Sequence, residues 1–196
     1  RTALSFHENA LDDMAMRMAR FPKSINFGVF EISGHEPGAI DQACEVVQPD
    51  VAIITIVGGD HRTNFAGGLE IAQEKGTLAQ RVAERAGIVL LNADDPLVRG
   101  MQARAAGKAL LYGEAPDADY RAIEVRHSRD GYLQFTCLHR GEALAFELAL
   151  LGRHLLVSTL ASIACAHQLG IPLQQLALRA RCYVQLPGRC SLHATK

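Results

Sequence analysis

The sequence lacks the charge and the long apolar runs that would point to nucleic acid or to a membrane. Its 196 residues carry 20 lysines and arginines against 21 aspartates and glutamates, which leaves a net charge of −1. No electrostatic argument therefore favours binding to nucleic acid or to an anionic bilayer. No apolar run is long enough to span a membrane, and no signal-peptide pattern is recognisable. We expect a cytoplasmic protein with neither kind of partner.

The sequence also lacks several short motifs that mark metal, disulfide or phosphate sites. Its five cysteines are odd in number, form no Cys-x-x-Cys pair and stand at Cys44, Cys137, Cys165, Cys182 and Cys190. We interpret them as buried, reduced thiols. The chain has no His-x-x-x-His pair, no Gly-x-x-x-x-Gly-Lys-Ser/Thr loop and no Gly-x-Gly-x-x-Gly that opens a helix. Nothing in it cradles a triphosphate through a glycine-rich loop.

What is present is a regular alternation of short apolar runs and amphipathic stretches. The alternation predicts strands over 25–32, 51–57, 88–91 and 108–112, with helices over about 10–21, 40–47, 69–86 and 96–106. Gly76 weakens the third helix or divides it. The alternation predicts a three-layer α/β fold with a mainly parallel sheet and flanking helices.

After residue 113 the pattern changes to strand–turn–strand. Runs over 121–127, 132–139 and 143–150 are joined by the turn pairs Asp130-Gly131 and Arg140-Gly141. We therefore expect a small antiparallel appendage over about 121–150. Two further helices, over 155–169 and 173–182, follow it.

The stretch around which these elements are arranged is 51–61, an apolar run that ends in Gly58, Gly59, Asp60 and His61. An unbroken apolar run predicts a strand buried on both faces. The glycines allow a sharp turn and a close approach of backbone to ligand. Asp60 and His61 then lie at the carboxyl edge of the sheet, where ligands bind in open α/β folds.

Polar residues follow three of the expected strands, and the fold should bring them to one edge. They are Glu31, then Asp60 and His61, then Asn92, Asp94 and Asp95. Carboxylate, imidazole and carboxamide groups gathered in this way suit Mg²⁺ together with phosphate oxygens. Each can also be an ordinary loop residue, and Asp94 and Asp95 can cap a helix that starts at Pro96. Lys75, taken alone, is a solvated lysine on a helix.

Five segments in this order resemble motifs of the Mur ligase family. The segments are 30–40 (FEISGHEPGAI), 49–61 (PDVAIITIVGGDH), 69–76 (LEIAQEKG), 91–95 (LNADD) and 152–154 (GRH), and 187–189 (PGR) resembles the arginine motif that follows. The ligases that add D-alanyl-D-alanine to a UDP-muramoyl tripeptide are the most similar subfamily by these motifs. The resemblance covers nearly the whole chain.

The resemblance implies a P-loop NTPase-like central ATP-binding domain over 1–186 and the start of a linker to a further domain over 187–196. Enzymes of this family use ATP and Mg²⁺ to join a carboxylate and an amine through an acyl phosphate. By the resemblance, Glu31 and His61 hold Mg²⁺, and Lys75 is carbamylated and becomes an anionic metal ligand. Lys75 and His61 are then the catalytic residues. Asn92, Asp94, Asp95 and Arg189 bind the nucleotide.

The sequence departs from the family pattern at the adenine side and at the phosphate loop. Leu155 and Ser158 stand where the family has asparagines, and the family P-loop does not occur within these 196 residues. We expect this chain alone to be inactive. Its partners would be a nucleotide and small carboxylate and amino-acid substrates, while its oligomeric state is not predicted. Two alternatives stay open: a divergent ligase for another carboxylate or a poly-amino acid, and a non-catalytic binding or scaffold module.

Overall fold

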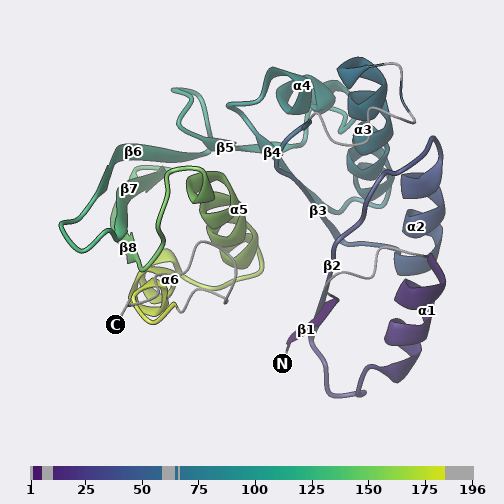
Figure 1. The fold of residues 1–196 in the computed structure, drawn as a ribbon, viewed down its shortest axis with the longest axis horizontal. Helices are drawn as coiled ribbons and strands as arrows, with labels where there is room; N and C mark the ends of the chain where they lie inside the picture. The colour runs from purple at the N-terminus through teal and green to yellow at the C-terminus, as the bar shows by residue number, and fades with distance from the viewer. Residues whose placement is uncertain (1, 6–10, 59–64, 66, 184–196) are drawn as a thin grey trace, which may run out of the picture. The chain divides into compact units, whose positions relative to one another are not determined.

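The structure is a computed structural model that describes residues 2–5, 11–58, 65 and 67–183 (Figure 1). The chain divides into two compact units. Unit 1 comprises 1–52, 57–89 and 100–108, and unit 2 comprises 53–56, 90–99 and 109–196. Each unit is described by itself.

Most of the strands form the mixed, mainly parallel sheet that the alternation predicts, whereas the strand expected over 25–32 lies in a separate two-stranded sheet. A six-stranded sheet has the order β3 (Val51–Ile54), β4 (Ile88–Asn92), β5 (Leu110–Gly113), β6 (Tyr120–His127), β7 (Leu133–His139) and β8 (Glu142–Leu148). The pairs β4–β5 and β5–β6 are parallel, and β6–β7 and β7–β8 are antiparallel. The α/β class and the antiparallel addition are therefore confirmed.

Unit 1 contains a strand near the N-terminus that the sequence analysis did not predict. Residues Thr2–Ser5 form a strand, β1, which pairs in parallel with β2 (Phe27–Phe30). A four-residue strand is too short to show a clear alternation of apolar and polar residues. Its partner strand also lies more than twenty residues away, so no local pattern indicates the pairing. The expected strand over 25–32 is correspondingly shorter.

The helices of unit 1 pack in sequence order. Figure 1 shows α1 (Leu11–Arg20), α2 (Ala39–Val47) and α3 (Gly68–Glu84) side by side, and α1 contacts α2 while α2 contacts α3. Their apolar stripes bury Met14, Ile40 and Ile71. Arg81 of α3 donates from Nε to Asp41 Oδ1 of α2 at 2.5 Å. This hydrogen bond lowers the pKa of Asp41.

Gly76 does not divide α3, which is continuous over seventeen residues. The glycine is buried where the helix meets Arg104, and a Cβ there would lie 2.8 Å from Arg104 Cδ. Arg104 donates to the Gln73 carbonyl and to Gln80 Oε1, one turn before and one turn after the glycine. Gly76 therefore leaves room for an arginine that binds the helix backbone.

Two expected elements are shorter or less enclosed than their patterns indicated. The helix that starts at Pro96 ends at Arg99 (α4), and a 3-10 turn, η1, completes it over Gly100–Ala103. Glycine at position 100 favours this break because it is a poor helix former. Ile53 on β3 is 36% exposed, so the expectation that this strand is buried on both faces was wrong.

Unit 2 is built on the antiparallel strands. Alternate residues of β7 are buried, among them Leu133, Phe135 and Cys137. Phe135 stacks on Phe146 of β8 with ring centroids 5.4 Å apart. Figure 1 shows α5 (Leu155–Gln168) and α6 (Leu173–Ala180) against this ribbon; α5 contacts β5 and β6, and α6 contacts β8.

Burial raises the pKa of the Cys137 thiol to about 12, which is consistent with an inert thiol. The four described cysteines are free, and Cys44 and Cys137 are buried as expected. The expectation was wrong for Cys182, which is exposed near the end of the described residues. No helix of the described residues has both the length and the apolar character needed to cross a membrane.

Candidate functional site

Asn92 lies at the end of β4 and is 4% exposed. Its Nδ2 donates to the Thr55 carbonyl at 2.7 Å, and its Oδ1 accepts from the Asp94 N–H at 3.0 Å. The side chain therefore joins the segment after β3 to the turn after β4. A buried carboxamide with both ends satisfied is held in one orientation.

Asp94 links the turn after β4 to the turn after β5. Its carboxylate accepts from the Glu114 N–H at 2.8 Å and from the Ala115 N–H at 2.9 Å. Gly113 makes this contact possible, since its φ is +150° and a Cβ there would lie 2.6 Å from Asp94 Oδ2. The carboxyl ends of two parallel strands are tied by one carboxylate.

Asp95 caps the N-terminus of α4, one of the two roles considered for it from the sequence. Its Oδ1 accepts from the N–H groups of Leu97 and Val98, at 2.9 and 3.2 Å. These are first-turn donors of α4, which have no partner within a helix. Capping and ligand binding are compatible roles for a residue at this edge, and its nucleotide contact stays a prediction.

Two further residues, to which the sequence analysis assigned no role, contact the turns held by Asn92 and Asp94. Arg153 forms an ion pair with Glu114, and its Nη1 lies 3.4 Å from the Val125 carbonyl. The GRH segment at 152–154 thus meets the strand end that Asp94 holds. The sequence signal for Arg153 was a glycine followed by arginine and histidine just before an apolar helix. Nothing in the sequence identified Glu114.

Gly152 explains why this segment starts with glycine. It has a φ of +133°, and a Cβ there would lie 2.5 Å from the His154 ring carbon Cε1. Any side chain at this position would displace the imidazole that precedes α5.

In unit 1 the structure places Glu31 and Lys75 on separate elements. Glu31 follows the last residue of β2 and is exposed, and Lys75 is half-buried on α3. Asp60, His61 and Arg189 lie outside the described residues. The proximity of Glu31, His61 and Lys75 therefore stays a prediction.

Among the residues that the resemblance assigns to Mg²⁺, Glu31 is the described carboxylate, and it is exposed. Within the described part of the chain, no group of three or more His, Cys, Asp or Glu side chains is placed to hold a metal. Mg²⁺ is commonly bound through one or two carboxylates, with phosphate oxygens and water in its other positions. An exposed carboxylate such as Glu31 suits that arrangement.

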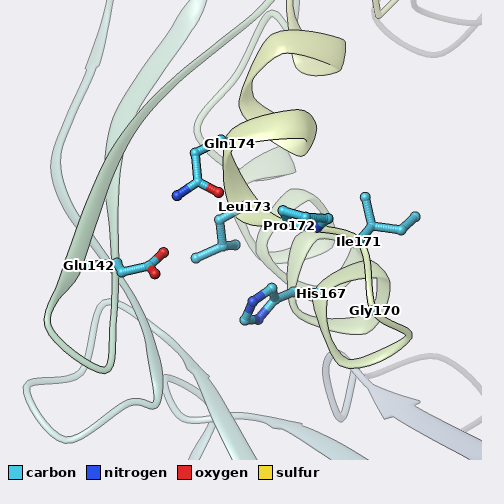
Figure 2. Close-up of a pocket in the computed structure, with 7 residues that line it drawn as sticks. All are labelled: Glu142, His167, Gly170, Ile171, Pro172, Leu173 and Gln174. Carbon is cyan, nitrogen blue, oxygen red and sulfur yellow. The ribbon is translucent and has the colours of Figure 1, made fainter.

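A cavity of about 240 Å³ lies elsewhere in unit 2, between β8 and the α5–α6 turn. Figure 2 shows Glu142 and His167 facing it from opposite sides, with Pro172 and Leu173 above the imidazole. None of the site residues predicted from the sequence lines it.

His167 is held by a short chain of hydrogen bonds. Gln168 Nε2 donates to the Tyr120 hydroxyl at 2.7 Å, and that hydroxyl lies 2.7 Å from His167 Nδ1. Because the amide must donate, the phenol can donate its own proton to Nδ1, which leaves His167 neutral with its proton on Nε2. Desolvation, followed by the neighbouring His139, lowers the pKa of His167 in the same direction.

Comparison with known families identifies the chain. The sequence model for the Mur ligase middle domain matches residues 7–166. The chain belongs to the Mur ligase family. A UDP-N-acetylmuramate–L-alanine ligase of Streptomyces coelicolor is 30% identical over 167 residues, which cover 84% of this chain and 36% of that protein.

Solved structures of Mur ligases share the fold of this middle domain. The MurF structure from Acinetobacter baumannii superposes with a TM-score of 0.87 at 21% identity, over 99% of this chain and 42% of that one. The MurF ligase from Thermotoga maritima in complex with ADP gives a TM-score of 0.75 at 16% identity, over 100% and 50%. The chain thus spans half or less of the length of these Mur ligases.

Proposed function

We propose that this chain is the central nucleotide-binding part of an ATP-dependent carboxylate–amine ligase that uses Mg²⁺. The observation that carries the proposal is the family match over 7–166, which includes Glu31, His61, Lys75, Asn92 and the Asp94–Asp95 pair. The complex of a MurF ligase with ADP supports nucleotide binding by the same fold. ATP would supply the phosphoryl group that activates the substrate carboxylate.

Each site residue has a chemical role in this proposal. Glu31 and His61 would hold Mg²⁺, and Lys75, as a carbamate, would add an anionic oxygen ligand. Asn92 would act through the turn that it fixes with Asp94, where one face of the nucleotide would lie. Arg189 would reach the nucleotide with a positive charge.

The relative and the motifs indicate different amino-acid substrates. The Streptomyces relative is an L-alanine ligase by name, whereas the motifs resembled ligases that add D-alanyl-D-alanine. We propose a cell-wall peptide precursor as the substrate class. The divergent ligase stays the second candidate, because Leu155 and Ser158 on α5 offer no carboxamide to an adenine.

Lys75 provides the test, in the complete ligase polypeptide that contains this chain. Lys75→Ala should abolish amide formation without unfolding the protein, and a short carboxylic acid in the medium should restore part of the rate. Lys108→Ala, at an exposed lysine, is the matched control and should stay active. Rescue by an alkylamine would show that the positive charge mattered and would reject the carbamate. A fully active Lys75→Ala variant would contradict the ligase proposal and favour the scaffold.

A further inference from the structure

Glu74, the residue before Lys75, caps a different helix. Its Oε2 accepts from the Gly38 N–H at 2.9 Å, and its Oε1 accepts from the Ile40 N–H at 2.8 Å. Gly38 is the N-cap residue of α2 and makes no side-chain cap of its own. A carboxylate from α3 thus satisfies two N–H groups at the start of α2, where negative charge is favoured.

The loop before α2 is packed around the Glu74 side chain. A Cβ at Gly34 would lie 3.0 Å from Glu74 Cγ and 3.1 Å from Ile40 Cδ1. Gly34 is itself buried, although it lies in a loop. The chain from Glu31 to Gly38 is therefore held at its middle by packing and at its far end by hydrogen bonds.

This contact joins the segments that carry two of the proposed metal ligands. Glu31 starts the loop that Glu74 holds, and Lys75 follows Glu74 on α3. Neighbouring residues on a helix point about 100° apart, so a fixed Glu74 also fixes the direction in which Lys75 leaves the helix. The two backbone hydrogen bonds restrict rotation of α3 about its axis relative to the loop.

We propose that Glu74 is a positioning residue that sets the spacing of Glu31 and Lys75 for Mg²⁺. The inference rests on the proposed ligase function. Glu74 does not touch the metal, since its two oxygens are occupied by the α2 backbone. It acts through the loop and the helix that it holds together.

A second link between the same helices provides a matched control. Arg81 and Asp41 also join α3 to α2, through a bidentate pair at 2.5 and 2.8 Å. Arg81 lies almost two turns beyond Glu74, and neither of its contacts involves the loop from 31 to 38. Loss of this pair should weaken the packing of α2 on α3 without moving Glu31.

The test compares Glu74→Gln with Asp41→Asn in the complete ligase polypeptide. A glutamine can accept one of the two N–H bonds, but its own NH₂ would face the other donor. We expect the Kd of Mg²⁺ in the presence of ADP, measured by calorimetry, to rise about tenfold in Glu74→Gln, as for the loss of one charge-assisted hydrogen bond. Hydrogen exchange of the 31–40 segment should become faster. Asp41→Asn should lower the melting temperature and leave the Kd unchanged.

Glu74→Asp keeps the charge on a side chain one methylene shorter, and it should give an intermediate Kd. If Glu74→Gln does not fold, this variant decides the question, and a wild-type Kd for it would overturn the inference. Equal Kd values for Glu74→Gln and Asp41→Asn would overturn it as well. Failure of the ligase proposal has a different signature, because Lys75→Ala would then be fully active.

Discussion

The Tyr120 hydroxyl lies between a donor and an acceptor, and this makes His167 sensitive to pH. The phenol accepts from Gln168 and donates to His167 Nδ1, so protonation of the imidazole would remove the acceptor. His139 stacks on Tyr120 with ring centroids 4.0 Å apart, and Arg140 also disfavours a charged His167, whereas Glu142 favours it. The folded protein therefore binds this proton less readily than the unfolded chain.

The sign of the pH dependence follows from this lowered pKa. The contribution of His167 to stability is complete above pH 6.5, its ordinary pKa, and is lost as the pH falls from there through the lowered value in the folded state. Tyr120→Phe removes the hydroxyl that favours the neutral ring. We expect the free energy of unfolding, measured with urea between about pH 5 and 7.5, to fall less steeply with decreasing pH in this variant. Tyr132→Phe, at a 41% exposed tyrosine, is the control. Parallel curves for wild type and Tyr120→Phe would contradict the role of the hydroxyl.

At the residue scale, the sequence located the polar edge of unit 2 but could not give its connections. Asn92, Asp94 and Asp95 were recognised because they follow a strand and precede Pro96. Their partners are backbone groups of other segments, such as the Thr55 carbonyl and the Glu114 N–H. Backbone groups are alike at every residue, so no local pattern identifies them. The capping role of Glu74 was missed for the same reason, because its carboxylate accepts from backbone N–H groups more than thirty residues away.

At the element scale, α3 shows a glycine used for its lack of a side chain. Alanine at position 76 would improve helix propensity by about 1 kcal/mol. Its Cβ would also displace Arg104 from the Gln73 carbonyl and from Gln80. We expect Gly76→Ala to be close to neutral in the wild-type background and to stabilise by about 1 kcal/mol in an Arg104→Ala background. Urea unfolding of the two single variants and the double variant measures this coupling. Equal effects of Gly76→Ala in both backgrounds would show that Arg104 does not need the space.

The elements that the sequence predicted well are those with their own periodicity. α2, α5 and the three antiparallel strands have apolar positions repeating at 3.6 or 2 residues, and their bounds agree with the expectation to within a few residues. β1 was missed because its partner strand lies more than twenty residues away in the sequence. The end of α4 was missed although Gly100, a poor helix former, follows it directly. β3 was expected to extend to residue 57, but it ends at Ile54. An apolar run does not show where the neighbouring strand ends, and so it does not fix the end of the pairing.

At the scale of the whole molecule, the order of the motifs was more informative than composition or charge. Composition and charge favoured neither nucleic acid nor a membrane as a partner, and they did not select a fold. The motifs from 30 to 189 named the family, and the family match over 7–166 confirmed it. They could not supply the geometry around His61 and Arg189, which are outside the described residues.

The last prediction concerns the 196-residue polypeptide by itself. Side chains such as Tyr112, Tyr120 and Leu160 are fully buried, and a chain of this size can bury a substantial core. We therefore expect a cooperative unfolding transition in urea, followed by circular dichroism.

The same polypeptide should not turn over ATP. The sequence of the chain contains no P-loop, and it covers 36% of the Streptomyces relative. Because this loop is what cradles the phosphates in P-loop proteins, we expect no Mg²⁺-dependent release of phosphate from ATP, measured with a coupled phosphate assay. Lys75→Ala in the same polypeptide separates true turnover from a contaminating ATPase. Phosphate release that this substitution abolishes would contradict the expectation and would show that the 196 residues hold a complete nucleotide site.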